Sequence, residues 1–219
     1  MTEEENAALV IKTGVEQLFV PFHELLGKLL GPAATEVGLS LGDSAKAWRF
    51  KRRIRVLQEV KRFVEETDKD IKPIATRLFF PAMDAASIED DDEMQTRWAA
   101  LLANEATSVG SVHPSFIDIL KQLTPADARL LDDLCDWCEQ KKTRKLVLGN
   151  LFTNPELRKL IDGNGKSLDN LVRLGLIQTD YEMREQPYEL GRPTQLESWY
   201  ELSDFAIRFV LACRAPAPT

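Results

Sequence analysis

A basic run between Lys46 and Arg62 is the densest group of residues that could do chemistry. It holds eight cations against one acid, Glu59, so its net charge is +7 in a chain whose net charge is -7. On a helix, a basic face with an aromatic residue beside it can bind the phosphates of nucleic acid or of an anionic lipid surface. The alternative is a solvated helix face whose cations pair with the acidic run at residues 89–93. The candidate contacts are Trp48, Lys51, Arg52, Arg55 and Arg62.

The acidic run Glu89–Glu93 could offer oxygen ligands to a divalent ion. It lacks the alternating ligand spacing and the glycine of a calcium loop. We interpret it instead as acids in the first turn of a helix, where the helix dipole favours them, after an N-cap at Ser87.

The cysteines and histidines give no complete site. Cys135 and Cys138 have the spacing of half a zinc site, but Cys213 stands alone and no second pair follows. On a helix both cysteines would share an apolar face, which predicts a buried structural role. Apart from His23, the only histidine is His113, and without a nucleophile motif it is predicted to cap or pack. We therefore predict no catalytic residue, metal, cofactor or small-molecule substrate, and an enzyme is the least favoured class.

Composition limits the classes of protein further. A length of 219 residues suits one large domain or two small ones, and the acidic balance does not suggest a general nucleic-acid binder. The acidic start of the chain, residues 1–6, is not that of a secretory leader, and three cysteines without framework spacing indicate a reduced, cytoplasmic protein.

The first two thirds of the chain are predicted to be helical, because apolar residues recur there at helical spacing. A long helix is expected within residues 33–66, and the next, over 74–86, contains Pro81, which predicts a kink or a break. A further helix runs to about Thr107. One face of the long helix carries Phe50, Ile54, Leu57, Val60 and Val64.

The last third predicts a different architecture. Thr124, Pro125 and Asp127 form a helix start, with a cap, a proline in the first turn and an acid three residues after the cap. Residues 167–177 predict a helix stopped by a glycine that leads into a strand, and residues 199–211 predict a strand, a Ser203 cap and a closing helix. The fold class is thus mainly α, with a helical domain at 1–122, a winged-helix-like α+β domain at 123–214 and a disordered tail at 215–219.

A winged helix could read DNA through the helix before its wing. The candidate contacts there are few, Lys166, Asn170 and Arg173, and the wing at residues 178–198 is net acidic, which would repel phosphate. We therefore favour a protein-contact or structural role over DNA reading. A third alternative is membrane action through residues 14–42, where Gly27–Gly31 and Gly38–Gly42 have the spacing of closely packed helices.

Four segments carry a family resemblance: residues 31–51, the acidic run with Trp98–Glu105, His113–Leu123, and Leu171–Ile177. In this order and spacing they resemble the bacterial abortive-infection alpha (Abi-alpha) family, over residues 30 to 213. The resemblance implies a role in bacterial defence against phage and implies no established catalytic residues.

These observations together predict a non-enzymatic phage-defence protein that acts through binding or assembly. A protein partner or self-association is expected. Nucleic acid and a membrane surface stay as alternative partners, for a winged-helix DNA-binding regulator and for a membrane-acting effector.

Overall fold

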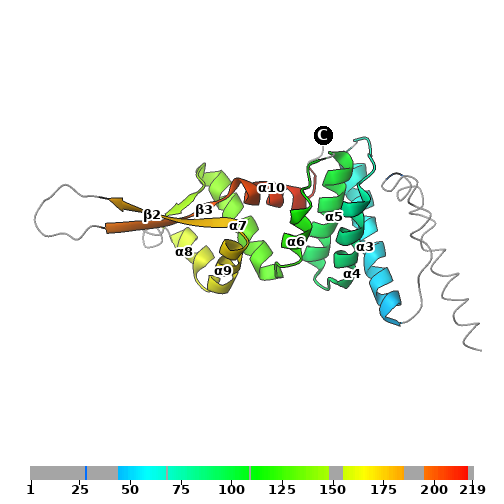
Figure 1. Ribbon diagram of the computed structural model, residues 1–219, viewed down its shortest axis with the longest axis horizontal. Coiled ribbons are helices and arrows are strands. Elements are labelled where there is room, and N and C mark those ends of the chain that lie inside the picture. The colour runs from blue at the N-terminus through cyan, green and yellow to red at the C-terminus, as the bar shows by residue number, and fades with distance from the viewer. Residues whose placement is uncertain are drawn as a thin grey trace, which may run out of the picture. The chain divides into compact units, whose positions relative to one another are not determined.

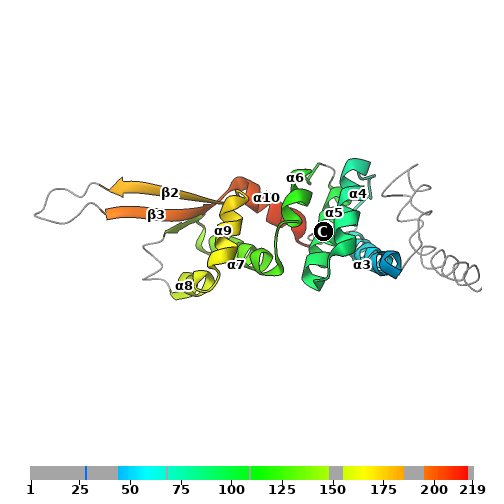
Figure 2. The ribbon, with the colours of Figure 1, turned by 60° about the horizontal axis from the view of Figure 1, so that its bottom comes forward.

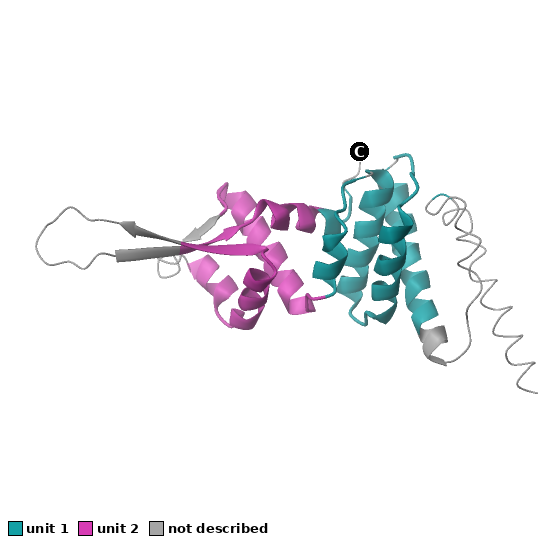
Figure 3. Cartoon of the chain, in the orientation of Figure 1, with its two compact units in different colours: residues 1–121, 212–219 teal, residues 122–211 magenta. Residues whose placement is uncertain are grey.

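A computed structural model describes residues 28, 44–67, 69–108, 110–147, 155–184 and 195–216 of the chain (Figure 1). The expectations for residues 14–42, for the two glycine pairs and for the end of the tail concern residues outside this part, apart from Lys28. The described residues are mainly helical, with a small sheet. They divide into two compact units, one of residues up to Lys121 together with Ala212 and beyond, the other of Gln122–Leu211 (Figure 3).

The first unit is helical. In it α3 packs against both α4 and α5, and α4 also contacts α6 (Figure 2). Trp98, Phe79 and Leu57 are its largest fully buried side chains, and the predicted apolar face of α3 is buried throughout. The helices are α3 (Ser44–Thr67), α4 (Thr76–Ile88), α5 (Asp92–Thr107) and α6 (Ser115–Leu120).

Two local expectations in this unit differ from the structure. Of the kink or break predicted at Pro81, the break does not occur, because helix α4 runs from Thr76 to Ile88 with Pro81 inside it and with Phe79 and Met83 on either side buried. Ser87 does not cap the next helix, since its hydroxyl donates to the Asp84 carbonyl at 2.6 Å within α4. Helix α5 is capped by Asp91, whose carboxylate accepts the Met94 backbone N–H at 3.0 Å.

The second unit combines helices with a three-stranded antiparallel sheet of order β1-β3-β2. Ile177 lies opposite Leu202 at the inner end of the β2–β3 hairpin, and both are buried. The elements are α7 (Pro125–Lys141), β1 (Lys145–Val147), α8 (Pro155–Ile161), α9 (Gly165–Arg173), β2 (Ile177–Arg184), β3 (Gln195–Leu202) and most of α10 (Asp204–Cys213).

The start and stop signals predicted for this unit are confirmed. Thr124 and Asp127 form a reciprocal capping box at the start of α7, with Pro125 in the first turn. After α9, Gly175 adopts φ 71°, and the Leu176 N–H donates to the Leu171 carbonyl at 3.0 Å, which ends the helix and begins the strand. Ser203 accepts the Ala206 N–H at 3.0 Å and caps α10.

None of the helices described here has both the length and the apolar character needed to cross a lipid bilayer.

Candidate functional site

The basic face of α3 is positioned by the apolar face on its other side. Lys51, Arg55 and Arg62 are exposed, whereas Arg52 is half-buried. Trp48 belongs to α3 by its backbone, and its side chain lies outside what the structure describes. Helix α3 therefore presents the predicted cations, but their partners decide what they can bind.

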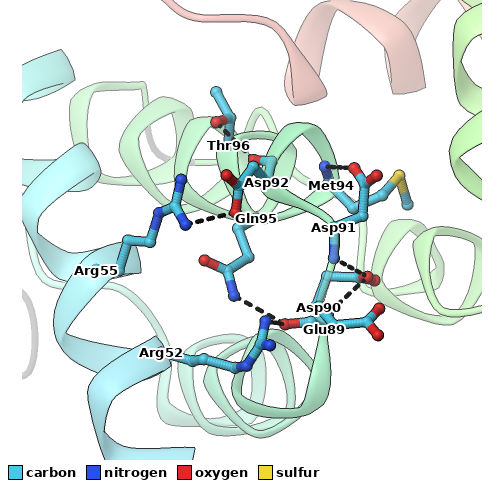
Figure 4. Close-up of polar contacts among 9 residues, drawn as sticks. All are labelled: Arg52, Arg55, Glu89, Asp90, Asp91, Asp92, Met94, Gln95 and Thr96. Atoms are coloured by element: carbon cyan, nitrogen blue, oxygen red, sulfur yellow. Dashed lines mark hydrogen bonds and ion pairs between the residues drawn. The ribbon is translucent and has the colours of Figure 1, made fainter.

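Arg55 is engaged by the first residue of α5. Its guanidinium donates to the carboxylate of Asp92, and both side chains are at least half exposed (Figure 4). The hydrogen bond to Asp92 raises the pKa of Arg55, and the reciprocal bond, with added charge from Arg52, lowers the pKa of Asp92. This contact is an exposed ion pair between α3 and α5, of the kind that the alternative interpretation predicted.

Arg52 holds the turn between α4 and α5. It donates to the backbone carbonyl of Glu89, and the Nε2 of Gln95 donates to the same oxygen at 2.8 Å (Figure 4). Gln95 is 2% exposed, so one of the two donors to this carbonyl comes from a buried side chain. Arg52 therefore supports the fold.

Arg62 pairs within its own helix. It contacts Glu59 at 2.6 Å and Glu66 at 3.2 Å, one turn away on either side, and lies over the ring of Phe63. The hydrogen bonds that Arg62 donates to the Glu59 carboxylate raise the pKa of Arg62. Arg53 likewise reaches Asp84 at 3.3 Å. These two cations are thus also matched by acids.

Arg49 and Lys51 differ from the other cations of α3. Both are exposed, and neither forms an ion pair or hydrogen bond with any residue the structure describes. The positive charge left unmatched on the described part of α3 is therefore at its N-terminal end. The sequence-based set did not include Arg49, and nothing in the spacing of the cations distinguished it from the others.

The side chains of the acidic run form bonds at the start of α5. Glu89 accepts the backbone N–H groups of Asp90 and Asp91 at 3.0 and 3.1 Å, Asp91 caps the helix, and Asp92 pairs with Arg55. The prediction of first-turn acids is correct for Asp92 and Glu93, whereas Glu89, Asp90 and the cap Asp91 precede the helix. In the described ranges no group of three or more His, Cys, Asp or Glu is placed to hold a metal ion.

The candidate contacts on α9 are tied into the second unit. The Asn170 amide donates to the Asp127 carboxylate at 2.8 Å and to the Gln122 carbonyl at 3.1 Å. Arg173 donates to the Asn170 side-chain oxygen at 3.0 and 2.8 Å and to Gln122 Oε1 at 3.1 Å. Lys166 is exposed and has no polar partner in the described residues. Base edges or phosphates would have to compete with these bonds at Asn170 and Arg173.

The sequence identified Asp127 only as a helix-start acid, and it predicted neither the burial of Asp127 nor the role of Glu105. Asp127 and Glu105 are 3% and 5% exposed. Glu105 accepts the N–H groups of Gly110 and Val112, at 3.1 and 3.0 Å, and so holds the loop after α5. A glutamate inside an otherwise apolar helical pattern was the available signal for Glu105.

The remaining candidates have structural roles. Cys138 is buried, as predicted, but Cys135 is only half-buried. Burial raises the pKa of Cys138 to about 11, whereas zinc needs a thiolate. His113 Nδ1 lies 2.6 Å from the Ser115 hydroxyl and accepts the Ser115 backbone N–H at 3.2 Å, as expected of a capping histidine at the start of α6.

Comparison with known proteins gives one match. No curated protein and no solved structure matches the chain. A family model described as abortive infection alpha matches residues 46–213, which is more than half of the chain. The match begins in α3 and ends with α10, so it includes both compact units. The chain therefore belongs to the abortive infection alpha family.

Proposed function

We propose that the chain is a bacterial, cytoplasmic phage-defence protein of the abortive-infection type that acts by binding or assembly rather than by catalysis. The observation that carries the proposal is the family match over residues 46–213, because it includes the elements of both units rather than one motif.

The bonding of its polar side chains supports a binding role. Asp127 and Asn170 join α7 to α9, and Arg52 satisfies a backbone carbonyl between α4 and α5. A general base or nucleophile must be available to substrate, whereas these groups are already committed to the fold. Arg49 and Lys51 are the exposed cations that an anionic partner could contact.

We further propose that the second unit is a winged helix used for recognition or assembly. The order α7, β1, α8, α9, β2, β3, with β3 central in the sheet, supports that topology. Residues 178–198, which include the hairpin, are net acidic in sequence, and a net-acidic wing would repel a phosphate backbone. A protein surface suits this hairpin better than DNA does.

Phage plating tests the defence role. Cells with the gene should be protected at low phage input, and the culture should collapse at high input. Arg49→Glu with Lys51→Glu should remove protection if the end of α3 is the contact, and Lys69→Glu with Lys72→Glu is the matched control, because these exposed lysines lie outside α3. Full protection by a folded Arg49/Lys51 variant would show that this end of α3 is not the contact surface. Failure of the wild type to protect against a broad phage panel would contradict the phage-defence role.

A DNA-binding regulator is the second candidate, favoured by the exposed Lys166 on α9, which has no polar partner among the described residues. It predicts duplex binding that weakens steeply with salt and is reduced by Lys166→Glu. A flat anisotropy titration at low salt would exclude it. The membrane-acting alternative concerns residues 14–42, and failure to float with anionic liposomes would count against it.

A further inference from the structure

Helix α4 has two large apolar side chains that no other described residue covers. Phe80 is 43% exposed and Ile88 is 56% exposed, and both are large hydrophobic residues in the same helix. At helical spacing they share one side of α4 with Arg77, Pro81 and Asp84. We name these five residues the α4 stripe.

The α4 stripe lies on the side of the helix away from the core. The buried residues of α4, among them Phe79, Ala82, Met83 and Ala86, form its opposite face, where α3 and α5 pack. The stripe therefore combines the exposed apolar surface of Phe80 and Ile88 with one charge of each sign, and Asp84 lies between the two hydrophobic residues. This combination can serve as an interaction surface.

The two charges of the stripe are available to a partner. Arg77 is exposed and forms no ion pair or hydrogen bond with the described residues. Asp84 is 69% exposed and makes a 3.3 Å contact with Arg53 through one oxygen, so its carboxylate retains acceptor capacity.

The order of residues in the stripe is self-complementary. The point midway between Arg77 and Asp84 falls between Phe80 and Pro81. If a second α4 runs antiparallel about a two-fold axis through that point, each Arg77 lies opposite the partner's Asp84 and the two Phe80 rings lie near the axis. A two-fold contact requires one patch to match itself, and this sequence of positive, apolar and negative residues does so.

We propose that the α4 stripe is the surface through which two copies of this chain associate, with their α4 helices antiparallel. Packed helix axes lie about 8–10 Å apart, a separation that an arginine and an aspartate can bridge. The contact is one helix pair and therefore small, so we expect a concentration-dependent dimer with a Kd of about 1–100 µM. The proposal names the partner in the assembly proposed above and rests on that proposal for its biological role.

Charge exchange on the full-length chain tests the dimer by sedimentation velocity. Arg77→Glu leaves two acids in each stripe and Asp84→Lys leaves two bases, so each variant alone should dimerise at least tenfold more weakly than the wild type. An equimolar mixture should recover the wild-type affinity, because both pairs across the axis are then opposite in charge. Recovery in the mixture requires the Arg77–Asp84 pairing and would not follow from a change in folding.

Two further variants separate surface from fold. Phe80→Asp should abolish the dimer while circular dichroism stays unchanged. Leu211→Asp, at a leucine that is 61% exposed on α10, should keep the Kd within twofold of the wild type. A wild-type chain that stays monomeric to 300 µM, or a mixture that fails to recover, overturns the proposal. A monomer in which Phe80→Asp accelerates amide exchange of residues 15–30 also overturns it and identifies the chain's own N-terminal segment as the cover.

These readouts do not depend on phage defence. Dimerisation with no protection in plating would contradict the proposed function but not the dimer. Protection by a purely monomeric chain would contradict the dimer but not the proposed function.

Discussion

Asn170 on α9 donates its side-chain amide to the carboxylate of Asp127 on α7 at 2.8 Å, across 43 residues of chain. The same carboxylate oxygen accepts the Thr124 backbone N–H at 2.9 Å. One buried acid thus caps a helix and fixes the position of a second helix, so the α7–α9 packing is set by a polar contact as well as by leucines such as Leu131 and Leu171.

Replacing Asp127 by alanine should destabilise the protein by about 2–4 kcal/mol, because a helix cap is lost and the Asn170 and Thr124 donors lose a charged acceptor. Urea unfolding followed by circular dichroism measures this loss. Asp133→Ala, on the exposed side of the same helix, is the matched control and should stay within about 0.5 kcal/mol of the wild type. Equal effects of the two variants would contradict a special role for Asp127.

The same acid should make stability depend on pH. Burial raises the pKa of Asp127, but hydrogen bonds from Ser167, Thr124 and Asn170 outweigh it and hold the pKa below its usual value. A depressed pKa in the folded state contributes stability above the unfolded value of about 3.9, and that contribution is lost as the pH falls through the folded value.

Comparison of the wild type with Asp127→Asn isolates this contribution. The difference in free energy of unfolding should be constant between pH 7 and pH 5 and should narrow below about pH 4. Other carboxylates titrate in both proteins, so their effect cancels in the difference. If the difference in free energy of unfolding stays constant down to pH 2, the charge of Asp127 is not what stabilises the fold.

How much the sequence could predict depended on how local each signal was. The Thr124 capping box, the Gly175 stop and the Ser203 cap follow from residue types a few positions apart, and the structure has all three. The bond between Asn170 and Asp127 could not be predicted, because it depends on how two helices pack. The same limit applied to the cations of α3, since nothing in their spacing showed which would meet Asp92 or Glu89. At Pro81 the helix continues between neighbours that are buried in the core, such as Phe79 and Met83. Ser87 was assigned wrongly for a local reason, because its hydroxyl bonds to the Asp84 carbonyl within α4 and Asp91 caps α5 instead.

Gly175 should be the more sensitive of two glycines around α9. It has φ 71° with open space at its Cβ position, so Gly175→Ala introduces backbone strain without a clash and should cost about 1 kcal/mol. Gly165 also has open space but not a left-handed backbone, and Gly165→Ala at the start of the helix should be neutral or slightly stabilising. Thermal unfolding of both variants measures this difference. Equal shifts in Tm would refute the explanation by backbone strain at Gly175.

Cys138 should be chemically inert in the folded protein. Burial raises its pKa to about 11, so at pH 8 its thiolate is about two hundredfold rarer than in an unfolded chain, whose cysteine pKa is about 8.5. Iodoacetamide labelling read by mass spectrometry should therefore modify Cys138 at least 100-fold more slowly in buffer than in urea. Comparable rates in the two solvents would show that the α7 face is open, and would reopen the question of metal binding by this cysteine pair.

Arg52 and Lys51 are adjacent in sequence but should respond differently to substitution. Arg52 is half-buried and donates to the Glu89 carbonyl, so Arg52→Ala should destabilise the first unit by about 1–2 kcal/mol. Lys51→Ala should leave stability unchanged within about 0.5 kcal/mol, because the exposed Lys51 makes no bond to any described residue. If phage protection is lost in Lys51→Glu while its unfolding curve matches the wild type, the positive charge at this end of α3 acts on a partner. If protection instead falls in proportion to stability across both positions, α3 contributes only to the fold, and the binding surface must be sought elsewhere.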